Sequence, residues 1–250
     1  MKQHIVKDHG PLLAKYYTYG DGQKQEGDPE HIHGTDLETF NNTSLGKQWG
    51  PFEQYDFISE GDSPAFLHLI NVGLQNLEHP EYGGWGGRLV PSDSLDDLWE
   101  DDNTVADWNP FSDTLDSTFP QTRWIPAIQE DFASRADWCV KPYDEANHPP
   151  EVRLSGGTNR KVIPGETIQI NPEIIDPDGD SLKLRWWRYA EVDLYEGNVD
   201  LPEGSSGSWE FHVPEDFAPG RSIHLILEVT DEAEHPMTRY TRLIVVGDDR

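Results

Sequence analysis

The chain has 250 residues, 35% of them hydrophobic, which is enough for one large domain or two ordinary ones with real cores. Asp and Glu outnumber Lys and Arg by 47 to 19, and the formal net charge of -28 would repel the phosphates of nucleic acids and of anionic membranes. The single cysteine excludes an intrachain disulfide, and the sequence has no long apolar run that would predict a membrane span.

The first predicted element is an amphipathic helix over residues 62–77. Asp62-Ser63-Pro64 can cap a helix and place proline in its first turn. Apolar residues then recur at spacings of four, four and three and line one helical face: Phe66, Ile70, Leu74 and Leu77. Residues 20–50 and 90–120 lack such a pattern and are rich in turn-forming residues, so we expect long loops there.

The segment Gly83-Gly84-Trp85-Gly86-Gly87-Arg88 surrounds one large ring with four glycines. Glycine tolerates positive φ, so the loop could bring Trp85 against a flat sugar face, with Arg88 as a hydrogen-bonding fork. The alternative is a tight turn in which Trp85 fills the core.

A second helix is predicted from about Ile125 to Val140, with Pro126 tolerated near its start. The clearest domain boundary follows at Asn147-His148-Pro149-Pro150, because two prolines remove two backbone donors and force an extended connection. We therefore divide the chain into domains 1–146 and 147–250.

The second domain has short β-type runs separated by turn signals, at residues 152–154, 167–170, 182–187, 209–213, 222–230 and 239–246. This spacing predicts an Ig-like antiparallel β-sandwich. Alternation predicts three rows that face its core: Leu182, Leu184 and Trp186; Trp209, Phe211 and Val213; and Ile223, Leu225, Leu227 and Val229. His224 and Glu228 are expected to face water.

Trp187 and Tyr189 should share the outward face of one strand. Two exposed rings in line could form a platform for a glucan chain, since ring faces pack on the C–H face of a sugar. The alternative is that the N-terminal domain covers this face.

The segment Asp176-Pro177-Asp178-Gly179-Asp180 places three carboxylates two residues apart beside a glycine turn. This pattern is the first half of a calcium loop, without its distal glutamate, and such a calcium would be structural. Turn chemistry between two strands explains the same residues, so both interpretations stay open.

Three segments resemble one protein family: Glu60-Gly61-Asp62-Ser63-Pro64-Ala65-Phe66-Leu67, Glu78-His79-Pro80-Glu81-Tyr82-Gly83-Gly84-Trp85-Gly86-Gly87-Arg88 and Asp137-Trp138-Cys139-Val140-Lys141-Pro142-Tyr143. On these residues the chain is similar, over about residues 55–250, to cellulose-binding proteins that carry a nucleoside-hydrolase-like domain followed by an Ig-like C-terminal domain.

The resemblance implies an α+β chain: the C-terminal part of a nucleoside-hydrolase-like α/β domain over 1–146, then the Ig-like sandwich. The first half of that domain, with its aspartate-rich metal loop, would precede residue 1. In nucleoside hydrolases a late aspartate completes a calcium site, and Asp62 matches it, although this chain has Gly61 where the hydrolases have histidine. Glu60 could add an oxygen and is placed among the expected sugar-contacting residues.

Two functional hypotheses follow. The first is a protein that binds a polysaccharide such as a cellulose-like glucan, without a catalytic residue in this chain and without a nucleic-acid or membrane partner. The second is a calcium-dependent hydrolase of N-glycosyl or related sugar bonds, which needs the upstream metal loop. Residues 1–7 do not resemble a signal peptide, whereas the family resemblance implies an extracellular or periplasmic location.

Overall fold

The computed structural model describes residue 42 and residues 64–249, except residues 94, 96, 97, 103 and 203–206. The chain divides into two compact units: Met1–Ser63 with Phe132–Ala146, and Pro64–Asp131 with Asn147–Arg250, which we call the larger unit. The two units differ from the predicted domains 1–146 and 147–250 in how they divide the chain. Residues 64–131 belong to the same unit as the C-terminal strands.

The described helical segments are short apart from one. They are the 3-10 helices η2 (Pro64–Leu69), η3 (Pro80–Tyr82), η4 (Tyr143–Glu145) and η5 (Ala190–Val192), and the α-helices α4 (Phe119–Thr122) and α5 (Ile125–Asp137). Helix α5 confirms the prediction for residues 125–140, although it ends three residues earlier. No described helix has the length and apolar character needed to cross a membrane.

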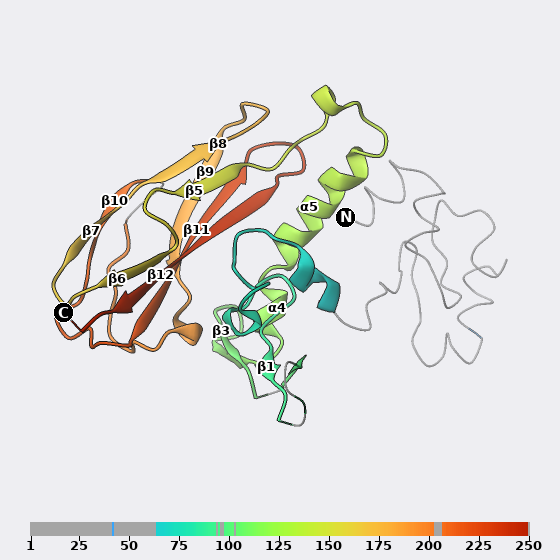
Figure 1. The fold of residues 1–250 in the computed structure, drawn as a ribbon. Helices are drawn as coiled ribbons and strands as arrows, with labels where there is room; N and C mark the ends of the chain where they lie inside the picture. Colours follow the sequence, from blue (N-terminus) through green and yellow to red (C-terminus); the bar gives the residue numbers. More distant parts are fainter. Residues whose placement is uncertain are drawn as a thin grey trace. The chain divides into compact units, whose positions relative to one another are not determined.

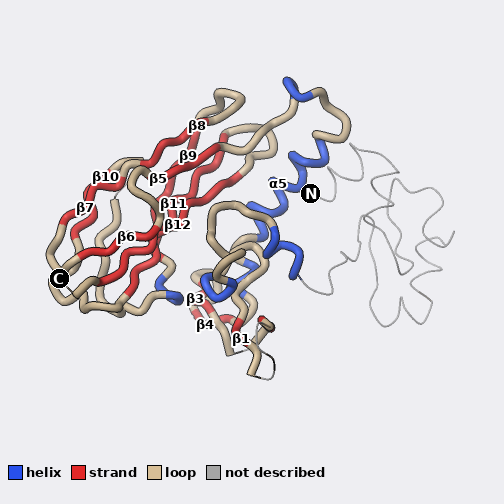
Figure 2. The backbone as a smooth tube through the Cα atoms, viewed as in Figure 1, coloured by secondary structure: helices blue, strands red, loops and turns tan. Residues whose placement is uncertain are grey.

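Strands, red in Figure 2, are the main regular structure of the remainder. Before residue 131 they form two small antiparallel hairpins within the predicted loop region, β1 (Val90–Pro91) with β2 (Trp99–Glu100) and β3 (Asp107–Asn109) with β4 (Thr114–Asp116). The later strands are β5 (Glu151–Leu154), β6 (Asn159–Val162), β7 (Thr167–Ile170), β8 (Pro172–Ile175), β9 (Leu182–Arg188), β10 (Trp209–His212), β11 (Ser222–Asp231) and β12 (Thr238–Gly247). The chain therefore has the predicted mixture of helix and strand.

A four-stranded sheet in the order β6-β12-β11-β9 is the framework of the larger unit (Figure 1). The β9–β11 and β11–β12 pairs are antiparallel, as predicted. The prediction of a wholly antiparallel sandwich is wrong at one pair, because β6 runs parallel to β12. The sequence pattern did not predict β6, because Asn159, Arg160 and Lys161 are all polar and lack the alternation of a half-buried strand.

The main core lies between this sheet and the pairs β7–β10 and β5–β8. All three predicted inward rows contribute to it, and Ile223, Leu225, Leu227 and Val229 are fully buried. At roughly 1.5–3 kcal/mol for each large apolar side chain removed from water, these rows are the main source of stability. The period-two alternation was therefore sufficient to predict this face.

The opposite face of the sheet is also covered, which the alternation did not predict. Leu74, Trp85 and Trp124 from residues 64–131 pack there against Ile226 and Tyr240 of the sheet. The prediction that His224 faces water is wrong: only 2% of it is exposed. Burial, followed by the neighbouring Arg242 charge, lowers the pKa of His224 to about 3, so it is neutral near pH 7.

Arg242 of β12 binds residues 64–131, which cover this face, to the sheet. Its guanidinium is fully buried and donates hydrogen bonds to the carbonyl oxygens of Leu74, Tyr82 and Gly83 at 2.8–2.9 Å. Its Nη1 also lies 3.1 Å from Nδ1 of His224. Burial lowers the pKa of Arg242 to about 10, which still leaves it charged.

The predicted helix over residues 62–77 is wrong beyond Leu69. Leu74 is fully buried as expected, but 59% of Phe66 is exposed. The chain instead runs beside β12, where the amides of Tyr240 and Arg242 donate to the carbonyl oxygens of Val72 and Gly73 at 2.8 and 3.1 Å. These bonds satisfy the edge of β12, which outweighs the local preference for helix.

Candidate functional site

A cleft of about 330 Å³ opens on the covered face of the sheet. Side chains of β9, β11 and β12 form one side, and residues 123–130, which include the first turns of α5, form the other. All the residues that line it belong to the larger unit.

Strand register brings the sheet residues of the cleft together. Glu228 of β11 lies opposite Arg185 of β9 on one side and opposite Tyr240 of β12 on the other. Trp187 follows Arg185 by two residues and so faces the same side of the sheet. The alternation that points Leu184 and Trp186 into the main core thus sends these side chains into the cleft.

Aromatic rings form much of the cleft wall. The ring centroids of Trp124 and Trp187 are 5.8 Å apart, and Trp124 packs edge-on against Tyr240 at 5.3 Å. The guanidinium of Arg123 lies 4.7 Å from the Trp187 ring centroid. The indole Nε1 of Trp187 is buried and has no hydrogen-bond partner among the described residues, which leaves a donor unsatisfied beside the cleft.

The charged groups of the cleft are paired. Arg185 donates to Glu228 at 2.8 Å, and Glu130 lies 3.3 Å from the imidazole of His235. Arg123 donates to the carboxylate of Asp107 at 3.1 Å. The two arginines and two glutamates that line the cleft give it no net formal charge.

Asp107, at the start of β3, holds the Arg123 side of the cleft in place. It is fully buried and accepts hydrogen bonds from Arg88 at 2.6 Å, from Arg123 and from the hydroxyl of Tyr189 at 2.6 Å. Burial, reinforced by this carboxylate, raises the pKa of the Tyr189 phenol far above its usual range, so the phenol remains a donor. Arg88, predicted as a fork for a ligand, is used by the protein itself.

The glycine-rich loop is a tight turn in the core. Gly84 and Gly87 pair with each other through two backbone hydrogen bonds of 3.1 and 2.8 Å, and only 1% of Trp85 is exposed. A Cβ on Gly86 would lie 2.2 Å from the ring of His68, so close packing requires glycine there. Trp85 therefore adopts the core-filling alternative and is not accessible to a sugar.

The rings of Trp187 in β9 and of Tyr189, the first residue after β9, do lie together, with centroids 5.4 Å apart. The prediction that they form an exposed platform is wrong, because Tyr189 is fully buried and Trp187 is half-buried. Residues 64–131 cover this face, as the alternative interpretation held. Of the two rings, only Trp187 lines the cleft.

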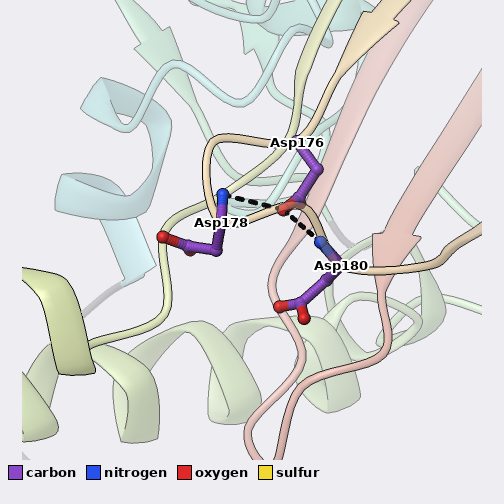
Figure 3. Close-up of side chains that lie close together, drawn as sticks. All are labelled: Asp176, Asp178 and Asp180. Atoms are coloured by element: carbon purple, nitrogen blue, oxygen red, sulfur yellow. Dashed lines mark hydrogen bonds between the residues drawn. The ribbon is translucent and has the colours of Figure 1, made fainter.

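Three of the four predicted metal ligands gather at the β8–β9 turn, as Figure 3 shows. Carboxylate oxygens of Asp176, Asp178 and Asp180 lie within 4.8 Å of one another. One oxygen of Asp176 accepts the backbone amides of the other two at 3.0 and 2.9 Å, which is turn chemistry. The other Asp176 oxygen is buried without a partner among the described residues, whereas the carboxylate of Asp178 binds His148.

Burial and the two neighbouring carboxylates raise the pKa of Asp180, which is the electrostatic pattern that a cation would relieve. The cluster nevertheless supplies fewer oxygens than the six to eight that calcium takes, so waters or backbone carbonyls would have to complete it. The two remaining predicted residues, Glu60 and Asp62, lie outside the described part of the chain.

Two segments of the chain are similar to domains of known proteins. Residues 1–89 match the model of the nucleoside hydrolase-like domain of cellulose-binding Sde182, and residues 167–246 match the model of the C-terminal domain of cellulose-binding protein Sde0182. The chain is thus similar, in two separate segments, to cellulose-binding Sde182 proteins. The family resemblance expected from the sequence is thus confirmed.

A solved structure of comparable fold is that of a nucleoside hydrolase-related hypothetical protein from Saccharophagus degradans that is described as associated with carbohydrate metabolism. It is 29% identical to the present chain, with a TM-score of 0.63, and the match covers 86% of the present chain and 54% of the relative. The present chain therefore spans about half the length of this relative. No curated protein matches the chain.

Several residues of the cleft were not predicted from the sequence. Trp124 immediately precedes α5, where its role could not be separated from ordinary helix packing. Glu228 was predicted to face water, but its salt bridge with Arg185 depends on the register of β9 against β11. Only the register between the predicted strands would have indicated that these residues lie together.

Proposed function

We propose that the protein binds an uncharged polysaccharide of the cellulose-like glucan type through the cleft beside Trp187. The observation that carries this proposal is a cleft that combines aromatic walls with paired charged groups in a chain similar to cellulose-binding proteins. Aromatic rings can pack on the C–H faces of a sugar. Carboxylates and guanidinium groups can hydrogen-bond its hydroxyls.

The cleft is large enough for only a few sugar units of a glucan chain. Its volume of about 330 Å³ lies near the lower end of the 300–1,000 Å³ range of small-molecule pockets. Such a concave site favours a single chain or a chain end over the flat face of a fibre. The unsatisfied indole donor of Trp187 is a group that a small ring movement could direct to a sugar oxygen.

Truncation of the central ring tests the proposal. We expect Trp187→Ala to weaken binding of a soluble β-1,4-glucan oligosaccharide about tenfold, because a lost ring contact costs on the order of 1.4 kcal/mol. Isothermal titration calorimetry measures the affinity, and a pull-down on microcrystalline cellulose measures retention on the polymer.

Two further variants control this experiment. Trp108→Ala removes a half-exposed tryptophan of β3 that does not line the cleft, and it should leave affinity unchanged. Trp187→Phe keeps a ring and should lose less affinity than Trp187→Ala. Equal affinity in wild type and in both Trp187 variants, with thermal melting showing that all are folded, would rule out this cleft as the glucan site.

Three further features are proposed on narrower support. The two-layer strand unit would be Ig-like, supported by the three alternating rows that fill its core. A structural calcium would bind at the β8–β9 turn, supported by the clustered carboxylates and the raised Asp180 pKa. The protein would act in the extracellular space or periplasm, because a glucan polymer lies outside the cytoplasm.

The alternative hydrolase function is not advanced. Its one candidate residue in this chain, Asp62, lies outside the described residues, and the cleft needs no contribution from it.

A further inference from the structure

We propose that Glu228 sets the charge selectivity of the cleft: by neutralising Arg185, it prevents the cleft from binding uronates and sugar phosphates. This inference rests on the proposed function, because it concerns the same cleft, and it adds a residue that decides between chemical classes of sugar.

Arg185 is the cationic group of the cleft that a ligand would meet first. Its side chain is 67% exposed, and it donates to Glu228 at 2.8 Å. The other arginine, Arg123, is only 19% exposed and is bound to Asp107. Its guanidinium also lies over the Trp187 and Tyr189 rings, which limits its freedom to turn toward a ligand.

The pairing of Glu228 with Arg185 is built into the sheet. The two residues are direct partners in the antiparallel register of β11 and β9, so their side chains meet on the same face. Glu228 is 23% exposed, whereas the other glutamate of the cleft, Glu130, is 46% exposed and lies against His235. Glu228 is therefore the carboxylate that occupies the Arg185 guanidinium.

An unpaired guanidinium would change the ligand class. Arginine binds carboxylates and phosphates through two parallel hydrogen bonds, which an uncharged hydroxyl cannot reproduce. Without the Glu228 charge, the lining would have two arginines against one glutamate and would attract an anionic sugar. The chain as a whole has a net negative charge and does not attract anions in general. Any gain in binding of an anionic sugar could therefore be assigned to Arg185.

The test compares two oligosaccharides of equal length on the full chain by isothermal titration calorimetry. One is a four-unit β-1,4-glucan and the other a four-unit oligogalacturonide, which carries a carboxylate on every sugar. Wild type should bind the neutral ligand at least tenfold more tightly. Glu228→Gln should reduce this ratio about fivefold, as expected for one charge interaction near a protein surface.

Two variants identify the cause. Glu232→Gln removes the same charge from a similar pair beside the same sheet: Glu232, the residue after β11, lies 2.9 Å from Lys183 of β9 and does not line the cleft. This variant should keep the wild-type ratio. Adding Arg185→Ala to Glu228→Gln should abolish the gained acidic binding, and so should 1 M salt, which shortens the Debye length to about 3 Å.

The outcomes separate the inference from the proposed function. If wild type binds neither oligosaccharide, the proposed function is wrong and the inference is wrong with it. If the neutral ligand binds in a Trp187-dependent way but Glu228→Gln and Glu232→Gln give the same ratio, only the selectivity inference is wrong. Equal affinity of wild type for both ligands would also overturn it.

Discussion

Two buried charged residues, one in the segment that covers the sheet and one in the sheet itself, hold polar groups together by hydrogen bonds. Asp107 joins Arg88, Arg123 and Tyr189, and Arg242 joins three carbonyl oxygens to the sheet. Removing one member of a buried charged pair costs about 3–5 kcal/mol, because the other charge is left without a partner. Arg88, which in the sequence looks like a ligand-binding residue, therefore has a structural role beside Asp107.

His224 should make stability depend on pH. Its imidazole is neutral in the folded chain down to about pH 3, whereas the unfolded chain takes up a proton below about 6.5. Acid therefore favours unfolding, and His224 should reduce the free energy of unfolding by about 1.4 kcal/mol for each pH unit below 6.5.

Urea denaturation of wild type and His224→Gln between pH 4.5 and 7.5 isolates this contribution as the difference between the two curves. Other titrating groups, including Asp193, whose pKa burial raises to about 6, contribute to both curves. If the free energies of unfolding of wild type and His224→Gln changed with pH in parallel, His224 would not be the source of this pH dependence.

At the scale of elements, the pairing of residues 72–73 with β12 is the contact that replaces the predicted helix. Gly73 has a φ of +95°, and a Cβ there would lie 1.8 Å from the carbonyl oxygen of Tyr240. We expect Gly73→Ala to lower the free energy of unfolding by roughly 3 kcal/mol or more, because both the backbone strain and the clash must be relieved.

Gly157→Ala is the matched control, since Gly157 also has a positive φ of +83° but has nothing within 4 Å of its Cβ position. It should cost only about 1 kcal/mol, the strain of the backbone alone. Equal losses in the two variants, measured by chemical denaturation, would mean that packing against β12 contributes nothing.

The β8–β9 turn gives the second test at this scale. If calcium binds at Asp176, Asp178 and Asp180, adding 1 mM calcium to chelator-treated protein should raise the melting temperature by several degrees, because a ligand of the folded state stabilises it. Asp180→Asn should abolish the increase. Asp216→Asn, a change at a carboxylate bonded to Tyr195, should retain it. An unchanged melting temperature in wild type would favour the plain turn.

At the scale of the whole molecule, the sequence predicted what depends on local pattern. The three alternating rows, helix α5 and the turn at Asp176 could all be identified from residue spacing. The helix over 62–77 failed because the hydrogen-bonding groups of β12, more than 160 residues away along the chain, offered Val72 and Gly73 a better arrangement.

The candidate site was harder to predict because it depends on contacts between distant segments. Trp187 was identified as an outward aromatic residue, but the cleft also needs Trp124 from the start of α5 and the Arg185–Glu228 register. Trp85 and Tyr189 have the residue types of a sugar site, and their burial becomes evident only when residues 64–131 pack on the sheet.

The two segments that share the outer edge of β12 also bear on self-association. Val72 and Gly73 occupy that edge at Tyr240 and Arg242, and β6 occupies it from Ile244 to Gly247. An unprotected strand edge can recruit a strand from a neighbouring molecule. Displacing residues 72–73 would therefore expose backbone groups of β12 to a strand of a second copy. We expect substitutions that displace these residues to cause concentration-dependent aggregation.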